Sequence, residues 1–587
     1  MRARLKAAWL TPVGGWPLTL LSLLACGVMA WMWAQVALST SWARIAALQT
    51  VETYAFAAYQ QIVHNLSLHG VFEQTLHKGY ADAWAWSGHR SGTIFLASWF
   101  YRLNPTSLGL ARFQIFTILA GVIPAMGLGR QGLKHPVGWA LGALIYLGTP
   151  PVMAIALQDY QDLALALPAL VFLAWSLRAH WAWVPLAALC ALLPREETTP
   201  LVLVMALSWP PGGWRSPHWR RWALNLSLCA LMTLGWVGAS EAIAPAEEAA
   251  YQMPLSDAVG GLGGGGAVIF LDGWSGLESF YLDLAWPTGV WGLLNPVPLA
   301  VSGGMALFHM SIPAGHAVDR SWVGHSHHIA PGLAFGMVAS IGGAAWLLSK
   351  LGAMRVSGAA RIAGLTGLFV LLFISIHGRF GVFAKDHALL LGRYAPAWTH
   401  PAWGLAAQLP PDAIPIVPVH LSLVVADRRT AYTLNASLRN KAPDMGLAAG
   451  THALIDTRET ATLVRIRSMP GAKLEAQDSP FELWSWHVGR PDPTWTREEP
   501  RGTQTAPEYL GPFRRPEQIP GVPAHVSAPV AQQGKPAPSI RIPWREGQAG
   551  EMGPPGPDPG TQHGRPEGPI PSAGPGPQPE GSGHSKR

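Results

Sequence analysis

Apolar runs alternate with short polar connections along roughly the first 380 residues. A helix needs about 20 apolar residues to cross the hydrocarbon of a bilayer, and fewer where polar residues line an internal cavity. This pattern predicts an α-helical integral membrane protein with about 11 transmembrane helices. The expected spans are residues 17–38, 107–129, 136–153, 161–178, 181–194, 197–210, 222–240, 275–294, 296–309, 328–349 and 362–377.

The longest polar connection between spans is the first loop, residues 39–106. Val51–Leu68 has the spacing of an amphipathic helix that carries Glu52 and Tyr59. Thr93–Leu103 is apolar but only about half as long as a span. We expect it to lie in the interface or to be re-entrant.

Arg and Lys determine the predicted orientation, because cytoplasmic loops carry an excess of them. With eleven spans, the basic groups all fall on one side; they are Arg2, Arg4, Lys6, Arg130, Lys134, Arg178, Arg215, Arg220, Arg221, Lys350, Arg355 and Arg361. This predicts a cytoplasmic N-terminus, residues 1–16, and an extracytoplasmic C-terminus. The run 17–38 is too long for a secretory signal core of about 7–15 residues, so we expect an uncleaved first span.

The character of the chain changes after residue 380. Residues 381–490 predict a small extracytoplasmic α/β domain, with short apolar strands at 414–417, 431–434, 453–456 and 481–488 and a helix-like segment at 421–427. Residues 491–587 are rich in Pro and Gly without a strict Gly-X-Y repeat, which predicts a disordered tail. Residues 17–380 form the transmembrane domain in this division.

Composition supports a membrane location. Only 13% of the residues are charged, against about 25% in a typical soluble protein. The net charge of +7 is spread over short loops and not gathered in a patch, so we expect no nucleic-acid partner. The three cysteines lie inside apolar runs and predict neither a disulfide framework nor a metal centre. Gly261–Gly266 matches G-x-G-x-x-G only formally, because it lies in a glycine-rich loop and not in a βαβ unit.

Four polar clusters fall on the outer side in this topology. Ionisable groups at the rim of a membrane region are costly and usually surround a wet cavity, which makes them functional candidates. The clusters contain Glu52 and His89; Asp159 and Asp162; Arg195, Glu196 and Glu197; and His325, His327 and His328.

Each cluster also has a structural interpretation. Glu52 can be a solvated loop carboxylate, and Asp159 and Asp162 can cap the following helix. Arg195-Glu196-Glu197 has little structural use between two apolar stretches, which favours a functional role. Imidazoles ligate divalent metals, so a divalent metal is left open as a cofactor at His325–His328, but the cluster lacks a spaced ligand pattern and interfacial hydrogen bonding is the favoured interpretation.

In their order, these clusters resemble a bacterial family of multi-spanning membrane proteins known only as a domain of unknown function and grouped with the GT-C glycosyltransferases. Three family motifs are similar to Ser87-Gly88-His89, to Asp159-Tyr160-Gln161 and to Arg195-Glu196-Glu197. A His-Tyr pair before a late span is similar to His327-His328. The resemblance covers roughly residues 45–490, including Pro410-Pro-Asp412 and Asp427-Arg-Arg429 in the α/β unit.

The sequence departs from the family pattern at three positions. Tyr54 occupies the expected acidic position of the first-loop helix and leaves Glu52 as the substitute. Gln161 replaces a His, and Leu163 replaces a Glu. If those positions are catalytic in the family, this chain has altered specificity or reduced activity.

The resemblance implies a GT-C-like fold and transfer of a sugar from a polyprenyl-phosphate donor on the outer face of the bacterial cytoplasmic membrane. Glu52 would be the general base, and Arg195 with Arg112 would stabilise the departing phosphate. Asp159 and Glu196 would orient the donor or hold a metal, and the expected partners are membrane lipid and the lipid-linked sugar. Two alternatives stay open: a transporter or flippase, which would place its binding groups near mid-membrane, and a non-catalytic envelope scaffold.

Overall fold

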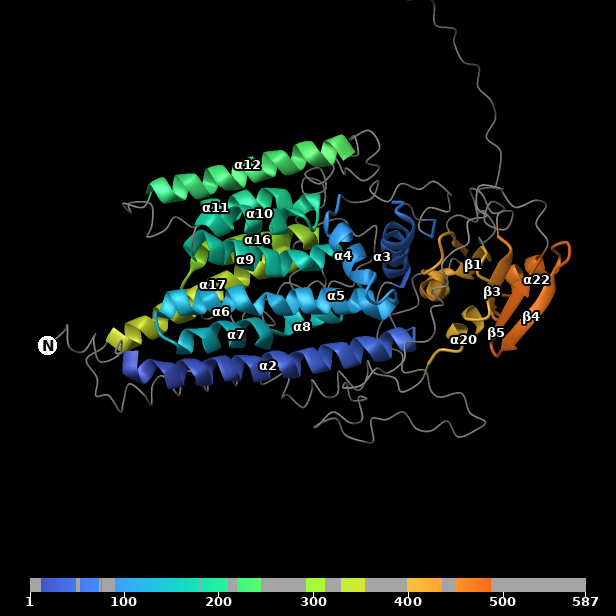
Figure 1. Cartoon of the computed structure of the whole chain (residues 1–587), viewed down its shortest axis with the longest axis horizontal. Coiled ribbons are helices and arrows are strands. Elements are labelled where there is room, and N and C mark those ends of the chain that lie inside the picture. Colours follow the sequence, from blue (N-terminus) through green and yellow to red (C-terminus); the bar gives the residue numbers. More distant parts are fainter. Residues whose placement is uncertain are drawn as a thin grey trace, which may run out of the picture. The chain divides into compact units, whose positions relative to one another are not determined.

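The computed structural model describes residues 12–48, 53–72, 75–76, 90–179, 181–208, 219–243, 292–311, 329–353, 399–434 and 450–486 (Figure 1). The expected span at 362–377 and the tail 491–587 lie outside this part of the chain, as do all but the last three residues of the span at 275–294.

Helices dominate the described residues before position 360. They are α2 (Pro12–Ala46), α3 (Thr53–His64), the π-helical turn η1 (Asn65–His69), α4 (Thr93–Tyr101), α5 (Ser107–Ala120), α6 (Val122–Leu133), α7 (Val137–Gly148), α8 (Pro150–Leu157), η3 (Asp162–Leu165), α9 (Ala166–Ala179), η4 (Trp181–Trp183), α10 (Val184–Leu192), η5 (Glu196–Thr198), α11 (Thr199–Leu207), α12 (Trp219–Ile243), α16 (Pro296–Ser311) and α17 (Ala330–Ala353).

Five of the described helical segments are long and apolar enough to cross a membrane, or six if the bent pair α7 and α8 is one span. The pair bends by 56° at Thr149-Pro150-Pro151. Thr149 is extended there, because a residue before proline is driven out of the helical region and proline itself lacks a backbone donor. Two expected spans, 181–194 and 197–210, contain the short helices α10 and α11 of nine residues each. The count of eleven stays a prediction.

Two further expectations differ in extent from the structure. The first span is longer than expected, since α2 continues to Ala46 and takes in the start of the predicted loop. The predicted amphipathic helix ends at His64 and passes into η1, which closes on Gly70 at φ +69°. Thr93–Tyr101 is helical as expected, and its relation to a membrane stays a prediction.

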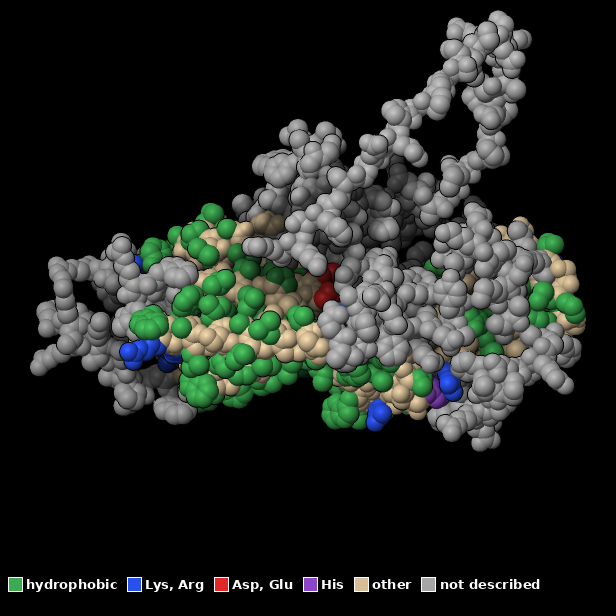
Figure 2. Space-filling model, turned by 90° about the horizontal axis from the view of Figure 1, so that it is seen from above, with side chains coloured by type: hydrophobic (Ala, Val, Ile, Leu, Met, Phe, Trp, Pro, Cys, Tyr) green, Lys and Arg blue, Asp and Glu red, His purple; other side chains and the backbone are tan. Residues whose placement is uncertain are grey.

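Apolar side chains cover the outside of the helices (Figure 2). On α2, Leu20, Leu21 and Leu24 are more than 60% exposed, and on α12 the same holds for Leu231 and Leu234. Exposed leucines in such number are unfavourable in water and favourable against lipid.

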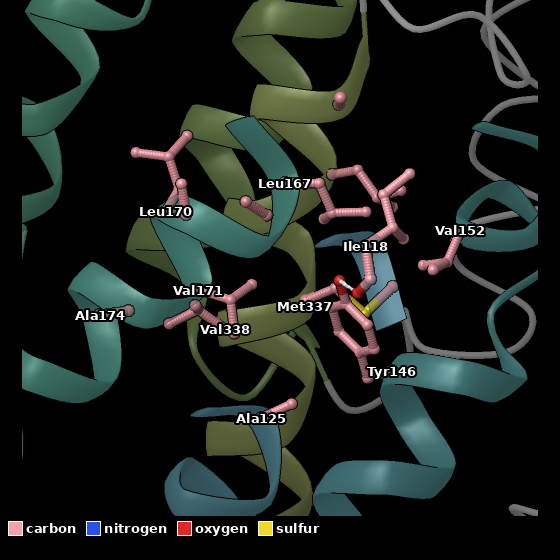
Figure 3. Close-up of a cluster of buried hydrophobic side chains, with 14 of the residues drawn as sticks. Ile118, Ala125, Tyr146, Val152, Leu167, Leu170, Val171, Ala174, Met337 and Val338 are labelled. Atoms are coloured by element: carbon pink, nitrogen blue, oxygen red, sulfur yellow. Dashed lines mark hydrogen bonds between the residues drawn. The ribbon is translucent and has the colours of Figure 1, made fainter. Parts of the chain in front are cut away.

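The helices pack around a core of buried apolar side chains, including Tyr146, Leu167 and Met337 (Figure 3). Within it, α6 and α7 approach each other closely. Gly129 lies against Gly138, and a Cβ added to Gly129 would come within 2.2 Å of the Gly138 carbonyl oxygen. Small residues of this kind let helix backbones meet in a bilayer. Tyr146 on α7 donates a hydrogen bond of 2.7 Å to the Ile118 carbonyl oxygen on α5, which satisfies its buried hydroxyl.

The residues after position 398 form a five-stranded sheet with the order β2-β1-β3-β5-β4. Its elements are α20 (Ala402–Ala406), β1 (Pro415–Pro418), the 3₁₀ segment η9 (Val419–Val425), β2 (Tyr432–Leu434), β3 (His452–Asp456), α22 (Thr460–Arg467), β4 (Lys473–Asp478) and β5 (Phe481–Ser485). Strands β2, β1 and β3 are parallel, and β5 and β4 are added antiparallel.

All four expected strand positions coincide with strands of this sheet. The helix-like segment at 421–427 is a 3₁₀ helix, and β4 was not expected. The side chains of β4 are almost all exposed, and its sequence, Lys-Leu-Glu-Ala-Gln-Asp, contains no run of apolar residues like those that located the other strands. We call residues 399–434 and 450–486 the α/β unit.

A second core joins the α/β unit to α3 and to the ends of α2, α4 and α5. It includes Phe56 and Val63 of α3, Tyr101 of α4, and Trp403 and Leu421 of the α/β unit, all at most 1% exposed. Helix α3 therefore lies between the long helices and the sheet, as Figure 1 also shows.

Candidate functional site

The first component of the site is the extended segment Gln158–Gln161, which joins α8 to η3. The buried amide of Gln114 on α5 holds this segment. Its Nε2 donates to the carbonyl oxygens of Ile155 and Gln158 at 3.2 and 3.0 Å, and its Oε1 accepts from Gln161 N–H at 2.8 Å. These bonds satisfy the backbone groups that the interruption of the helix leaves open.

Asp162, fully buried at the start of η3, pairs with Arg195. The Arg195 Nε lies 2.8 Å from Asp162 Oδ1, a close ionic contact that is poorly aligned for a hydrogen bond. Oδ1 also accepts from the N–H of Leu163 at 2.7 Å, whereas Oδ2 has no hydrogen-bond partner among the described residues. Asp162 thus pairs with Arg195, which comes from the segment between α10 and α11. Its bond from the Leu163 N–H at the start of η3 is also what the helix-cap interpretation predicts, although the N-cap residue itself is Gln161 and makes no side-chain cap.

Arg195 lies between α10 and α11, where it is 4% exposed. Its Nη2 donates to the Tyr59 hydroxyl at 3.0 Å, and its Nη1 lies 3.8 Å from Glu197 Oε1. Burial by itself would lower the pKa of Arg195, but the Asp162 carboxylate, Tyr59 and Glu197 together outweigh burial and raise it. The guanidinium is therefore a permanent cation in a mostly desolvated place, where its attraction to an anion is stronger than in water.

Tyr59 of α3 is a site residue that the sequence did not identify. Its ring meets the ring of Tyr160 edge to face at a centroid distance of 5.5 Å. Burial raises the pKa of Tyr59, so its hydroxyl stays protonated at neutral pH and accepts the bond from Arg195. In the sequence, its position on the amphipathic first-loop helix was the one feature that marked Tyr59 as a candidate. That position does not indicate Arg195 as its partner.

Asp159 has a different arginine for a partner. Arg44, near the end of α2, lies with its Nη2 3.9 Å from Asp159 Oδ1 and donates through Nη1 to the Leu157 carbonyl oxygen. Both side chains are buried, and with Ser41 and Phe56 they line a small pocket. Arg44 was not a predicted site residue. The two aspartates of one short segment thus contact arginines from two separate helices.

Glu196 and Glu197 are both exposed, and Glu196 does not contact Arg195 in the described contacts. The Glu196 Oε2 accepts from Arg90 N–H at 2.9 Å, and the Arg90 Nη1 lies 3.4 Å from Ser240 Oγ on α12. The carbonyl oxygen of Leu193 accepts from the N–H groups of Gly92 and Thr93 at 2.8 and 3.2 Å. These bonds together hold the end of the first loop against Glu196, the end of α10 and α12.

The structure thus brings Asp162, Arg195 and Glu197 together, whereas Asp159 contacts Arg44 and Glu196 contacts the backbone of Arg90. Arg112 lies on α5 and is partly buried. Glu52, His89, His325, His327 and His328 lie outside the described residues. Within the described residues, no group of three or more His, Cys, Asp and Glu side chains is placed to hold a metal ion.

His64 gives the fold around α3 a dependence on pH. It is 4% exposed and packs against Tyr101 and His69; burial, then the charges of His69 and Arg428, lowers the pKa of His64 to about 3. The unfolded chain, with an ordinary pKa of about 6.5, binds more protons between these values, so stability falls on acidification. We expect the unfolding free energy to drop by about 2 kcal/mol between pH 6.5 and pH 5 through this residue.

Thermal unfolding at pH 7 and pH 5 checks this expectation. His64→Phe should reduce the difference in melting temperature between the two pH values, because the buried ring then cannot take up a proton. An unchanged difference in the variant would contradict the role of His64.

Comparison with known proteins finds one family whose model matches part of the chain. Residues 44–253 match the family described as predicted membrane protein (DUF2079). This match includes Arg44, Tyr59, Asp159, Asp162 and Arg195. It confirms, for these residues, the resemblance to membrane proteins known only as a domain of unknown function, and together with the apolar helices it identifies a membrane protein with several candidate spans.

Two crystal structures of ArnT from Cupriavidus metallidurans are similar to this chain. The apo structure is 14% identical with a TM-score of 0.45, over 76% of this chain and 95% of that one. The structure bound to undecaprenyl phosphate is 16% identical with a TM-score of 0.46, over 79% of this chain and 97% of that one. No curated protein matches the sequence.

Proposed function

We propose that the chain is a bacterial membrane glycosyltransferase that takes a sugar from a polyprenyl-phosphate donor on the outer face of the cytoplasmic membrane. The observation that carries the proposal is the buried Arg195, held by Asp162 and Tyr59. Its third contact, to the exposed Glu197 at 3.8 Å, is too long for a hydrogen bond. An anionic oxygen could approach Nη1 without breaking the bond to Tyr59.

Arginine suits a lipid phosphate because its planar donors bind two oxygens at once. In the proposed reaction, the acceptor hydroxyl oxygen attacks the anomeric carbon as the bond from that carbon to the phosphate oxygen breaks. The phosphate leaves with the electron pair, and Arg195 with Arg112 stabilises its negative charge. Glu52 takes the proton of the acceptor hydroxyl.

The contacts of the described residues sharpen the other assignments. Asp162 and Tyr59 hold Arg195 in place, and Glu197 is the group that a phosphate oxygen would displace. Asp159, next to Arg44, and Glu196, next to Arg90, would orient the donor. His89 and His325–His328 would complete the substrate site. The orientation, with a cytoplasmic N-terminus, rests on the distribution of Arg and Lys.

The experiment that tests this function measures the lipid product. The purified full chain is incubated with polyprenyl-phosphate-linked sugars of several kinds and with envelope lipids as acceptors, and release of free polyprenyl phosphate is followed by mass spectrometry. We expect release with at least one sugar, and an exposed-site control, Lys473→Gln on β4 of the α/β unit, should behave like the wild type. Binding of the lipid donor without any release would support the scaffold alternative.

The general base provides a separate prediction. Glu52→Gln keeps the size of the side chain and removes its ability to accept a proton, so turnover should fall by about 100-fold or more while donor binding persists. Steady-state kinetics with the active donor checks this. Wild-type turnover in Glu52→Gln would show that another group is the base.

A further inference from the structure

Helix α3 has two faces with different partners. Tyr59 projects from one face to Tyr160 and Arg195. Gln61 and Asn65 are four residues apart, one on α3 and one on η1, and therefore lie on a common face. Both side chains donate to backbone carbonyl oxygens of the α/β unit, Gln61 to Arg428 and Asn65 to Arg429, each at 3.1 Å. Since 100° per residue separates successive helical positions, Gln61 lies nearly opposite Tyr59.

Gln61 uses its whole amide in these contacts. Its side chain is fully buried, and besides donating to the Arg428 carbonyl oxygen, its Oε1 accepts from the N–H groups of Thr75 and Leu76 at 2.8 and 3.1 Å. A buried amide whose N–H group and oxygen are both hydrogen-bonded has one favoured orientation. Losing either bond leaves a buried backbone group without a hydrogen-bond partner.

Residues 75 and 76 continue the connection to the sheet. The Thr75 hydroxyl donates to the Ala431 carbonyl oxygen at 2.6 Å and accepts from Ala431 N–H at 3.0 Å. The Thr433 hydroxyl of β2 donates to the Leu76 carbonyl oxygen at 2.9 Å. Gln61 of α3 thus contacts two other parts of the chain: residues 75 and 76 of the first loop, and the segment between η9 and β2.

The acceptor of the Gln61 bond is itself fixed. The Arg428 guanidinium, 9% exposed, donates through Nη1 to the Pro410 carbonyl oxygen at 2.7 Å and through Nη2 to that of Leu409 at 3.2 Å. These bonds tie the segment after α20 to the residue whose carbonyl oxygen faces Gln61. The α/β unit therefore offers α3 a rigid contact surface.

We propose that Gln61 is a positioning residue, which seats α3 against the α/β unit so that Tyr59 reaches Arg195. The α/β unit then acts on the candidate site through α3, although none of the described hydrogen bonds or ion pairs joins the unit directly to Arg195. This inference rests on the proposed function where it concerns turnover, and on geometry alone where it concerns the contact between α3 and Arg195.

The test combines hydrogen exchange with kinetics on the full chain. In Gln61→Leu, amides of α3 should exchange about tenfold faster, and so should those of residues 193–199, which Gln61 does not touch. Turnover of the lipid donor should fall at least tenfold while its KM stays within about twofold, because misplacement of a site group costs rate more than binding. The matched control is Gln408→Leu, whose exposed side-chain amide donates to the Gly404 carbonyl oxygen of the neighbouring helix α20.

The outcomes separate the two proposals. Absence of transfer in the wild type would refute the proposed function, and the exchange data would still decide the inference. Faster exchange confined to α3, with residues 193–199 unchanged, would overturn the positioning role, as would normal turnover in a variant with loosened α3. If Gln61→Leu does not accumulate, Thr75→Val tests the same connection by removing the hydroxyl bonded to Ala431.

Discussion

Replacing Arg195 with glutamine is expected to destabilise the protein by about 3–5 kcal/mol as well as to abolish transfer, because it leaves a fully buried carboxylate without its cation. Asp162 is 0% exposed, and its Oδ2 already lacks a hydrogen-bond partner in the described structure. The remaining donor, Leu163 N–H, cannot offset the charge. Thermal unfolding in detergent and the lipid-release assay measure the two effects.

A second substitution separates stability from function. In Arg195→Gln with Asp162→Asn, the buried charge is gone, so most of the lost stability should return while transfer stays absent. If stability and transfer both returned, Arg195 would contribute to stability alone and not to transfer. Failure to recover stability would show that the two side chains are not the coupled pair that their 2.8 Å contact indicates.

Gly142→Val is expected to be the most disruptive single change in the helical core, with a loss of about 3 kcal/mol or more. A Cβ at this position on α7 would lie 2.1 Å from the Ala125 carbonyl oxygen and 2.8 Å from the Met126 Cα of α6. Both are backbone atoms, so the clash cannot be relieved by a side-chain rotation and the helices must separate. The melting temperature and the yield of monodisperse protein in detergent report the effect.

Gly235→Val is the matched control, because this glycine is also within an apolar helix, α12, but has nothing within 4 Å of an added Cβ. It should leave the melting temperature nearly unchanged. Equal losses in the two variants would mean that valine acts through local helix propensity and not through the contact between α6 and α7.

Much of the local structure could be predicted from the sequence. Apolar length identified the helices, although the Thr149-Pro150-Pro151 bend was missed. Short apolar runs located four strands of the sheet but not β4, whose exposed residues form no such run. The polar clusters at 159–162 and 195–197 were recognised because charge inside an apolar sequence is costly wherever it is placed. Their partners were not recognised.

The missed partners share one property, which is distance along the chain. Tyr59 and Arg195 are separated by 136 positions, and Gln61 and Arg428 by 367. Local periodicity says which face of a helix is polar, but not which remote group it meets. Arg44 was overlooked for the same reason, since one basic residue at the end of an apolar helix resembles a boundary marker.

The sequence by itself determined that this is a membrane protein with several apolar helices and a small α/β unit, because burial of apolar surface and the cost of charge in lipid act on each segment separately. Only the tertiary structure decided that Asp162 and Asp159 pair with different arginines, that Tyr59 completes the Arg195 site, and that α3 is seated on the sheet through Gln61. Those pairings depend on which buried donors and acceptors the packed helices bring together, and no single segment contains that information.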